Sequence, residues 1–279
     1  MHRRPSAPLA QIPLGLEKTG FLLEHSVAEV FRAAGWGAIC NRYDVDDFDG
    51  RAREMDLVVY RICKSDGLDV VTCALVSCKN DATNTWAFMS RDKPGVDPNV
   101  QWEPVHAWTD HDALAPYLHS STWMADYVHG DKGVYEACFK PERSVFGFQL
   151  LSADGKSPQN DKPIYDSISG LMKALGYELA ALPNRQRSKS RLYFYTLLVV
   201  ADAPLVDVRY SGTDGAAFEV EHMLHVARYM VNKCDLTAQI HFVRADQIEA
   251  FVSRLDGLAE YNARFADALV KTLVSQTGP

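Results

Sequence analysis

Three stretches decide the fold class of this chain: TGFLLEHSVAEVFRAAGW (residues 19–36), REMDLVVYR (residues 53–61) and ALVSCKN (residues 74–80). In the first stretch, apolar residues recur at three- and four-residue spacing, which predicts an amphipathic helix. Thr19 is a candidate cap for this helix and Gly35 a glycine stop. The other two stretches predict strands over 55–60 and 70–79, because they are rich in valine, as strands covered on at least one face are.

The rest of the chain alternates between strand and helix patterns. A short apolar run at 38–40 follows the first helix, and later strands are expected at 144–151, 192–201, 205–210 and 239–243. Helices are expected at 111–118, 120–128, 164–177, 246–254 and 258–275. The order of helix, three strands, helix, strands and helix predicts an α/β protein with a central mixed β-sheet flanked by helices.

No internal repeat or low-complexity linker divides the chain. Residues 1–18 are expected to form a loose N-terminal arm, and residues 19–279 a single domain. Within that domain, approximately residues 81–143 are expected to be an insertion after the third strand, with three tryptophans before residue 110. A chain of 279 residues is long enough to bury a core without disulfide bonds.

The composition is that of a folded protein. Apolar residues make up 47% of the chain and charged residues 23%, which excludes a disordered, collagen-like or disulfide-stapled chain. The net charge of −7 argues against a protein that coats nucleic acid by bulk charge. No apolar run reaches the roughly 18 residues of a membrane span, and the polar, proline-rich start is unlike a signal peptide. We therefore expect a cytoplasmic protein without a membrane partner.

The cysteines and histidines give weak signals. None of the six cysteines forms a CxxC pair, so zinc spacings are missing, and we expect reduced, buried thiols on strands. His222 and His225 lie in EVEHMLH, which suggests a helix on which Glu221 and His225 are four residues apart. That pair either binds a metal or, as is more common in proteins, consists of polar side chains on an exposed helix face. Phosphate-binding glycine loops and the GxSxG nucleophile motif do not occur.

One set of residues is a candidate catalytic site. Glu24 lies on the first helix, Asp56 near the start of the second strand and Lys79 at the end of the third. Carboxylates can hold Mg²⁺ or Mn²⁺, which assists phosphodiester hydrolysis, and a lysine can orient water or stabilise developing charge. Alone, Glu24 would be a solvated surface acid and Lys79 a polar strand end. Asp56 lies within the run Met-Asp-Leu-Val-Val, where an unpaired charge is costly. The joint occurrence favours a site.

These three stretches resemble the PD-(D/E)xK nuclease superfamily, which has the restriction-endonuclease-like fold. The motifs are most similar to the branch around Mrr-type restriction enzymes and archaeal Holliday-junction resolvases. Glu24 matches the family's helical glutamate, Asp56 its metal-binding aspartate and Lys79 its catalytic lysine. The resemblance covers residues 19–80 and implies a Mg²⁺- or Mn²⁺-dependent nuclease, acting on DNA more than on RNA. It also implies a homodimer and a role in restriction or anti-phage defence, with a larger defence complex as a further partner.

One position departs from the family's pattern. Two residues before Lys79, where the family carries an acid or glutamine, this chain has Ser77, which offers only a hydroxyl or its backbone carbonyl. Three explanations stay open. In the first, Asp56 and Glu24 hold the metal with backbone or water oxygens. In the second, a carboxylate from elsewhere has moved into the site. In the third, catalysis has lapsed and the chain is a nucleic-acid-binding or regulatory subunit. The carboxylates that could have moved are Glu54, Asp81 and Glu29.

A basic segment precedes the most apolar strand. Residues 183–191, PNRQRSKSR, carry four positive charges and no acid, at Arg185, Arg187, Lys189 and Arg191. In a loop, such residues either contact nucleic-acid phosphates or simply keep the loop soluble. If the chain is a nuclease, this loop is the first choice for backbone contact. The second choice is the set of arginines that flank the aspartate strand, namely Arg51, Arg53 and Arg61.

Overall fold

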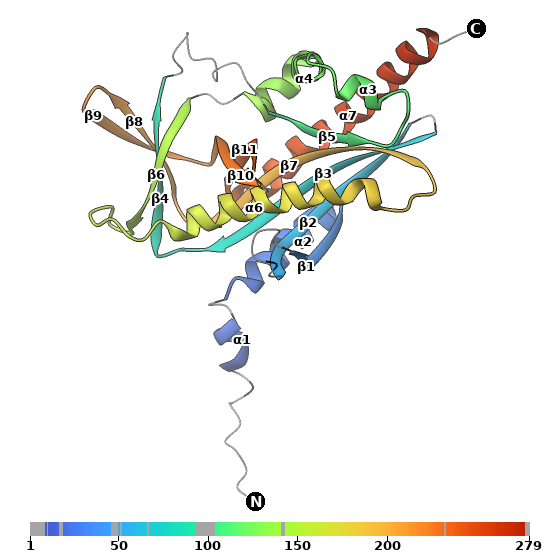
Figure 1. Cartoon of the computed structure of the whole chain (residues 1–279). Helices are drawn as coiled ribbons and strands as arrows, with labels where there is room; N and C mark the ends of the chain where they lie inside the picture. Colours follow the sequence, from blue (N-terminus) through green and yellow to red (C-terminus); the bar gives the residue numbers. More distant parts are fainter. Residues whose placement is uncertain are drawn as a thin grey trace, which may run out of the picture.

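The structure is a computed structural model that describes residues 9, 11–16, 19–45, 50, 52–65, 67–92, 104–140, 143–231 and 233–276. It is a mixed α/β protein with a central mixed sheet flanked by helices, as the sequence predicts (Figure 1). None of its described helices combines the length and the apolar character that crossing a membrane requires.

The central sheet has the strand order β1-β2-β3-β7-β11-β10, and β5 also pairs with β7. Its strands are β1 (Gly37–Val45), β2 (Ala52–Ser65), β3 (Leu68–Asn80), β5 (His106–Thr109), β7 (Ser190–Asp202), β10 (His222–Val231) and β11 (Cys234–Arg244). Neighbouring strands are antiparallel from β1 to β3, parallel from β3 through β7 to β11, and antiparallel again at β10. The predicted strands are all present, and most are longer than the sequence pattern indicates.

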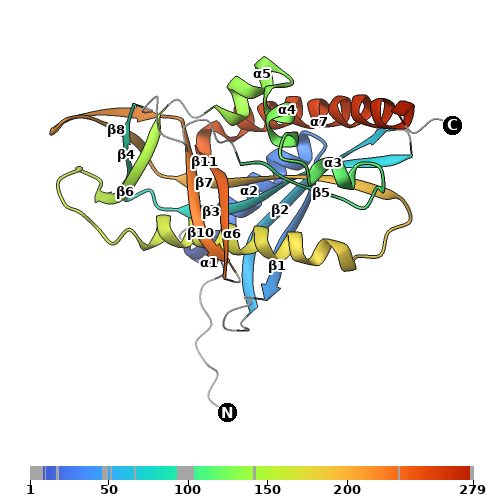
Figure 2. The ribbon, with the colours of Figure 1, turned by 45° about the horizontal axis from the view of Figure 1, so that its top comes forward.

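Helices cover both faces of this sheet (Figure 2). Helices α2 (Phe21–Ala33) and α7 (Ile248–Gln276) share one hydrophobic core with the sheet, while α6 (Lys162–Ala181) closes a second core on the other face. The prediction of two helices at 246–254 and 258–275 is wrong, since α7 is continuous. Gly257 is accommodated there because Leu255, Leu258 and Ala259 continue the buried stripe on either side of it.

Helix α2 ends as predicted but does not begin as predicted. Gly35 has a φ of +83°, a left-handed conformation that glycine adopts at a helix C-terminus without steric cost. Thr19 is not the cap, because the residue before the helix is Gly20 and the Thr19 hydroxyl donates to the Leu16 carbonyl at 2.6 Å. Of the predicted loose arm, residues 1–18, the described part includes one short helix, α1 (Gln11–Leu16), which projects from the body in Figure 1.

A second, four-stranded sheet was not predicted. Its order is β6-β4-β8-β9, from the strands β4 (Asn84–Arg91), β6 (Ser144–Ser152), β8 (Leu205–Ser211) and β9 (Asp214–Val220). The parallel pair β3 and β7 turns at 81–83 and 203–204 and continues as the parallel pair β4 and β8. Backbone bonds from Asp81 to Asp202 and from Trp86 to Pro204 hold the two turns together. The second sheet therefore extends from the end of β3 that carries Lys79.

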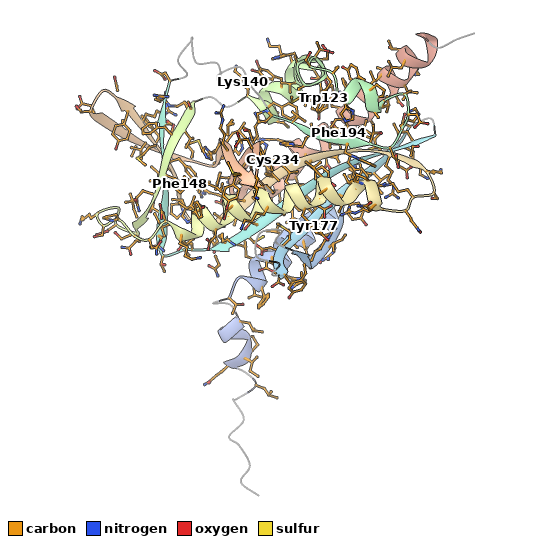
Figure 3. All side chains as sticks on the ribbon, viewed as in Figure 1. Trp123, Lys140, Phe148, Tyr177, Phe194 and Cys234 are labelled. Atoms are coloured by element: carbon orange, nitrogen blue, oxygen red, sulfur yellow. The ribbon has the colours of Figure 1, made fainter. Side chains whose placement is uncertain are left out.

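The segment 81–143 takes part in both sheets and in the core. Besides β4 and β5, it forms α3 (Ala115–Leu118), α4 (Trp123–His129), α5 (Lys132–Val134) and a π-helical turn (Tyr135–Phe139). The helices expected at 111–118 and 120–128 correspond to α3 and α4. Tyr127 stacks on Phe194 of β7 with ring centroids 4.9 Å apart. Trp123 and Phe194, both labelled in Figure 3, belong to the core that α7 covers.

The prediction of a helix around His222 and His225 is wrong. Both residues lie on strand β10, where His222 pairs with Val243 and His225 with Ile240 of β11. Both are largely shielded from water, and this desolvation lowers the pKa of each to about 4. The four-residue spacing from Glu221 is therefore not an i,i+4 pair, because pairing with β11 outweighs the local helical pattern.

The expectation of buried thiols on strands is confirmed for some of the six cysteines. Cys73 and Cys78 are buried on β3, and Cys138 is buried in the π-helical turn. Cys40 and Cys234 are exposed, because β1 is an edge strand and Cys234 stands at the start of β11.

Candidate functional site

Asp56 of β2 binds the backbone of the neighbouring strand through its side chain. The pairing of β2 with β3 begins at Leu57 and Val76, so Asp56 stands opposite Ser77, just beyond the ladder. The Cys78 N–H donates to Asp56 Oδ2 at 2.7 Å, and the Ser77 hydroxyl donates to the same oxygen at 3.3 Å. Asp56 thus has a defined orientation before any ligand is bound.

The strand is irregular at this residue. Leu57 packs in the core under α2 and α7, whereas Met55, two residues earlier, packs in the core under α6. Residues two apart on a regular strand share a face, so the alternation is interrupted at Asp56. Across from it on β1, Asn41 has a φ of +53° and is skipped in the pairing, which joins Cys40 to Leu57 and Arg42 to Met55. The interruption leaves a charged side chain directly before the buried run Leu57, Val58 and Val59 of β2.

Lys79 lies beside Asp56 at the end of β3. Its Nζ is 3.8 Å from Asp56 Oδ2, and the side chains are 30% and 20% exposed. A long, solvent-exposed ion pair of this kind adds little to the stability of the fold. The two charged groups are therefore better explained by a role in binding a ligand from solvent. Next to Lys79, the Asn80 amide donates to the Thr19 carbonyl at 3.4 Å. That bond places the start of α2 beside the end of β3.

Glu24, in the first turn of α2, completes the group. Its side chain reaches back over Gly20, where a Cβ would be 3.3 Å from Glu24 Oε1. The pKa of Glu24 is raised from its ordinary value, first by burial and then by the negative charges of Asp56 and Glu54, while Lys79 opposes the rise. The structure therefore brings the predicted residues Asp56, Ser77 and Lys79 into contact. Glu24 lies near enough for the charges of Asp56 and Lys79 to act on its carboxyl group.

The donor set at this site suits a hard divalent cation. The charges of Asp56 and Glu54 both raise the pKa of Glu24, and the positive charge of Lys79 lowers it. Carboxylate oxygens are the ligands that Mg²⁺ and Mn²⁺ prefer. Over the described ranges, no three His, Cys, Asp or Glu side chains already stand at metal-binding spacing. The residues fit such an ion in donor chemistry and charge, and the exposed Glu54 and half-buried Glu24 would have to turn toward it.

The other two acids considered for the site are engaged elsewhere. Glu29 pairs with Arg32 at 2.6 Å on the exposed side of α2. Asp81 accepts a hydrogen bond from the Trp86 indole at 2.8 Å and another from Asn84, which closes the turn between β3 and β4. Glu54 is the one of the three whose charge raises the pKa of Glu24.

The basic loop lies at the opposite end of the sheet. Strand β3 pairs with β7 from Leu68, opposite Ser190, to Asn80, opposite Asp202. Arg191 is therefore opposite Asp69, ten residues from Lys79, which is roughly 33 Å along an extended strand. In Figure 1, α6 runs from near the second sheet to this loop at the other side of the molecule. The structure does not bring the four basic residues to the acid–lysine group.

Three of the four basic side chains make contacts within the protein. Arg185 pairs with buried Glu178 at 2.9 Å, and Arg191 lies 3.8 Å from Asp69 and donates to the Tyr193 hydroxyl. Arg187 is only 6% exposed; it lies 3.5 Å from Asp110 and its guanidinium stacks 4.6 Å from the Trp108 ring. Lys189 is exposed. These contacts fasten the loop to the sheet.

Of the second-choice arginines, the structure describes the side chain of Arg61, which is engaged away from the site. Arg61 donates to Asp256 of α7, which also accepts a hydrogen bond from the Trp36 indole at 2.7 Å. Arg51 lies outside the described residues, and so does the side chain of Arg53.

Sequence reasoning missed a buried ion cluster at Glu178. This residue is 2% exposed on α6, and its carboxylate pairs with Arg42 of β1 at 2.5 Å as well as with Arg185. The Tyr195 hydroxyl donates to the same carboxylate at 3.4 Å. Glu178 follows Leu171 and Leu175 at helical spacing, so its place on the apolar stripe of α6 was the signal that could have revealed it.

No protein-family model, curated protein or solved structure matches this chain. The function of the chain is therefore inferred from the geometry of the site.

Proposed function

We propose that this chain is a Mg²⁺- or Mn²⁺-dependent nuclease that hydrolyses phosphodiester bonds in nucleic acid, DNA more than RNA. The observation that carries the proposal is the meeting of Glu24, Asp56 and Lys79 at the adjoining ends of α2, β2 and β3. The succession of α2, β1, β2 and β3, followed after the segment 81–161 by α6 and β7, is compatible with the restriction-endonuclease-like core that the motifs of residues 19–80 imply.

Each residue has a role that its contacts support. Asp56 would hold the cation through Oδ1, because the bonds it makes to Ser77 and Cys78 within the described residues both use Oδ2. Ser77 acts as an orienting donor to Asp56 instead of a charged ligand. Glu24 adds a second carboxylate, and Lys79 presents an ammonium that can orient water or stabilise negative charge on the phosphate. A bound Mg²⁺ would polarise the phosphate and make its bound water more acidic.

A second candidate function is nucleic-acid binding or regulation without catalysis. Ser77 stands where an acid is expected, and its hydroxyl already donates to Asp56. This candidate predicts nucleic-acid binding that needs neither Asp56 nor a divalent ion.

A plasmid assay with Mg²⁺ or Mn²⁺ separates the two functions. We expect Asp56→Ala and Lys79→Ala each to reduce nicking by at least about 100-fold, since each removes charge at the reacting phosphate. Glu29→Gln, an exposed acid on the same helix as Glu24, serves as the matched control and should nick like the parent chain. Nicking that survives both site variants would overturn the assignment. A chain that binds DNA but nicks no substrate would favour the second candidate.

We also propose that two copies act together, since cutting both strands of a duplex requires two sites, and that the biological role is restriction or anti-phage defence, alone or within a larger complex. The molecular mass in solution, measured with and without duplex DNA, tests the dimer. A monomer that cuts both strands at matched positions would exclude it.

A further inference from the structure

We infer that strand β9 (Asp214–Val220) pairs with β9 of a second copy of this chain, antiparallel and about a two-fold axis at Ala217. This inference rests on the proposed function, in which two copies act together, and it names the surface through which they join. The partner is a second copy because the open edge of β9 is complementary to itself.

Strand β9 is an edge of the second sheet. It pairs with β8 on one side and, among the described strands, with none on the other. Residues 214–219 are exposed, and the large apolar side chain of Phe218 is 44% exposed. In Figure 1 the hairpin of β8 and β9 projects at the left of the molecule. The open edge thus lies on the outside of the described structure.

The sequence of β9 lacks the usual protection of an edge strand. Natural edge strands commonly carry lysine, proline or a bulge, which keep other strands from pairing with them. The strand DGAAFEV has neither lysine nor proline, and its register with β8 is regular from end to end. The small residues Ala216 and Ala217 lie at its centre, where they let another backbone approach closely. The edge is therefore suited to pairing.

The turn before β9 determines which of its backbone groups are free. Gly212 has a φ of +63°, and Ser211 pairs with Asp214 across a two-residue turn. A turn with glycine at its first central position closes with a hydrogen bond between the residues on either side of it. Bonded and non-bonded pairs alternate along an antiparallel ladder, so Ala216 and Phe218 bond to β8. The backbone groups that point to the open edge are those of Gly215, Ala217 and Glu219.

One register joins all of these free groups. With Ala217 opposite the partner's Ala217, Gly215 of each copy is opposite Glu219 of the other, and every such pair exchanges backbone hydrogen bonds. A shift of the register by two residues leaves one of these residues without its counterpart. The arrangement is also closed, because the same edge is used by both copies.

The side chains fit the same register. Ala216 is opposite the partner's Phe218, so the exposed ring packs beside a small side chain and is shielded from water. Glu219 is opposite a glycine, and Asp214 is opposite Val220, so no like charges stand directly across from one another. Pairing of two copies therefore covers apolar surface without bringing the acids of β9 together.

Sedimentation equilibrium without nucleic acid tests the inference. We expect the parent chain to be a dimer at micromolar concentration. Ala217→Lys should raise the dissociation constant of the dimer at least ~100-fold, because two lysines would stand opposite each other at the axis. Ser211→Lys adds the same charge to β8 of the same hairpin, away from the open edge, and should leave the dimer as it is. Circular dichroism checks that each variant keeps the fold, which we expect because both positions are exposed.

An exchange of charge adds a positive test. Ala217→Glu should be a monomer for the same reason as Ala217→Lys. A mixture of the two variants should form a heterodimer, since opposite charges then meet at the axis. Recovery on mixing would show that both variants are folded and that position 217 of one copy meets position 217 of the other. Two folded variants that do not combine would contradict the register.

The outcomes separate this inference from the nuclease activity. A parent chain that stays a monomer, with and without duplex DNA, would overturn both the pairing of two copies and the role of β9. A dimer that survives Ala217→Lys would show that the copies join elsewhere, and the role of β9 would be wrong. If Asp56→Ala nicks plasmid as the parent does while Ala217→Lys still separates the copies, the nuclease site is wrong and the role of β9 is confirmed.

Discussion

Strands β3 and β7 run side by side over 13 residues each, and their two ends differ in how charges are arranged. At the Lys79 end, the described side chains include the partly exposed pair of Asp56 and Lys79, and the charges of Asp56, Glu54 and Lys79 act on Glu24. Toward the other end, each arginine of the basic loop is paired with an acid: Arg185 with Glu178, Arg187 with Asp110, and Arg191 with Asp69.

The paired charges of the basic loop stabilise the fold, whereas the charges at the Lys79 end are available to bind a ligand. When one member of a buried ion pair is removed, the other is left as a buried charge without a partner, and the fold loses stability. Like charges gathered at an exposed strand end repel one another in the folded chain, and a ligand of the opposite sign relieves that repulsion. We therefore expect substitutions at the far end to change stability and substitutions at the Lys79 end to change binding and activity.

The largest stability effect is expected at Glu178. Replacing it with alanine leaves Arg42 and Arg185 facing each other without the buried carboxylate between them. The free energy of unfolding should fall by about 3–5 kcal/mol. Urea unfolding followed by tryptophan fluorescence measures the change, with Glu29→Ala as the control that should cost no more than ~1 kcal/mol. A loss at Glu178 no larger than that of the control would mean that the far end is not held by its ion pairs.

A smaller effect is expected at Arg187. Its guanidinium donates to the carbonyls of Arg185 and Leu182 and stacks on Trp108, so Arg187→Ala should lower the free energy of unfolding by about 2 kcal/mol. Lys189→Ala, two residues along the same loop but exposed, is the matched control and should leave stability unchanged within ~0.5 kcal/mol. If Arg187→Ala weakens DNA binding strongly while stability stays the same, the loop is a binding surface and the contrast between the two ends fails.

The two ends also differ in how far the sequence predicts them. Local patterns were enough for α2, β2 and β3, because apolar periodicity and valine-rich runs report on a few neighbouring residues. Asp56 and Lys79 could be placed at strand ends for the same reason. The interruption at Asp56 and the bond from Asn41 to Glu54 could not be predicted, since they depend on the register between β1 and β2.

In the basic loop (residues 183–191), in β10 and in the second sheet, contacts between distant parts of the chain decide the structure. The basic loop contains no acid of its own, yet its arginines find Glu178, Asp110 and Asp69, which lie in other parts of the chain. His222 belongs to a strand although its local pattern suggested a helix, because β11 pairs with it. The second sheet arises where β3 and β7 turn together, which no single segment reveals.

The smallest expected effect is a pH dependence at Glu24. Its pKa in the folded chain is raised above the ordinary value of 4.5, so the folded state binds the proton more tightly than the unfolded chain does. This contribution to stability is fully present below pH 4.5 and is lost as the pH rises through the raised pKa. Glu24→Gln removes the ionising group and should therefore be more stable than the parent chain at neutral pH. The gain should stay below ~1 kcal/mol, because the side chain is only half-buried and solvent screens it.

Urea unfolding at a series of pH values, with a chelator present, measures this difference. The stability advantage of Glu24→Gln should be present at pH 7 and shrink toward pH 4 as the parent glutamate becomes protonated. Saturating Mg²⁺ should reverse the sign at pH 7, because the cation that relieves the repulsion binds the parent chain and binds the variant less well. A variant that is less stable than the parent at pH 7 without metal would show that Glu24 is stabilised by its neighbours. In that case the Lys79 end would be a paired structural cluster like the other end, and the reason for placing chemistry there would be lost.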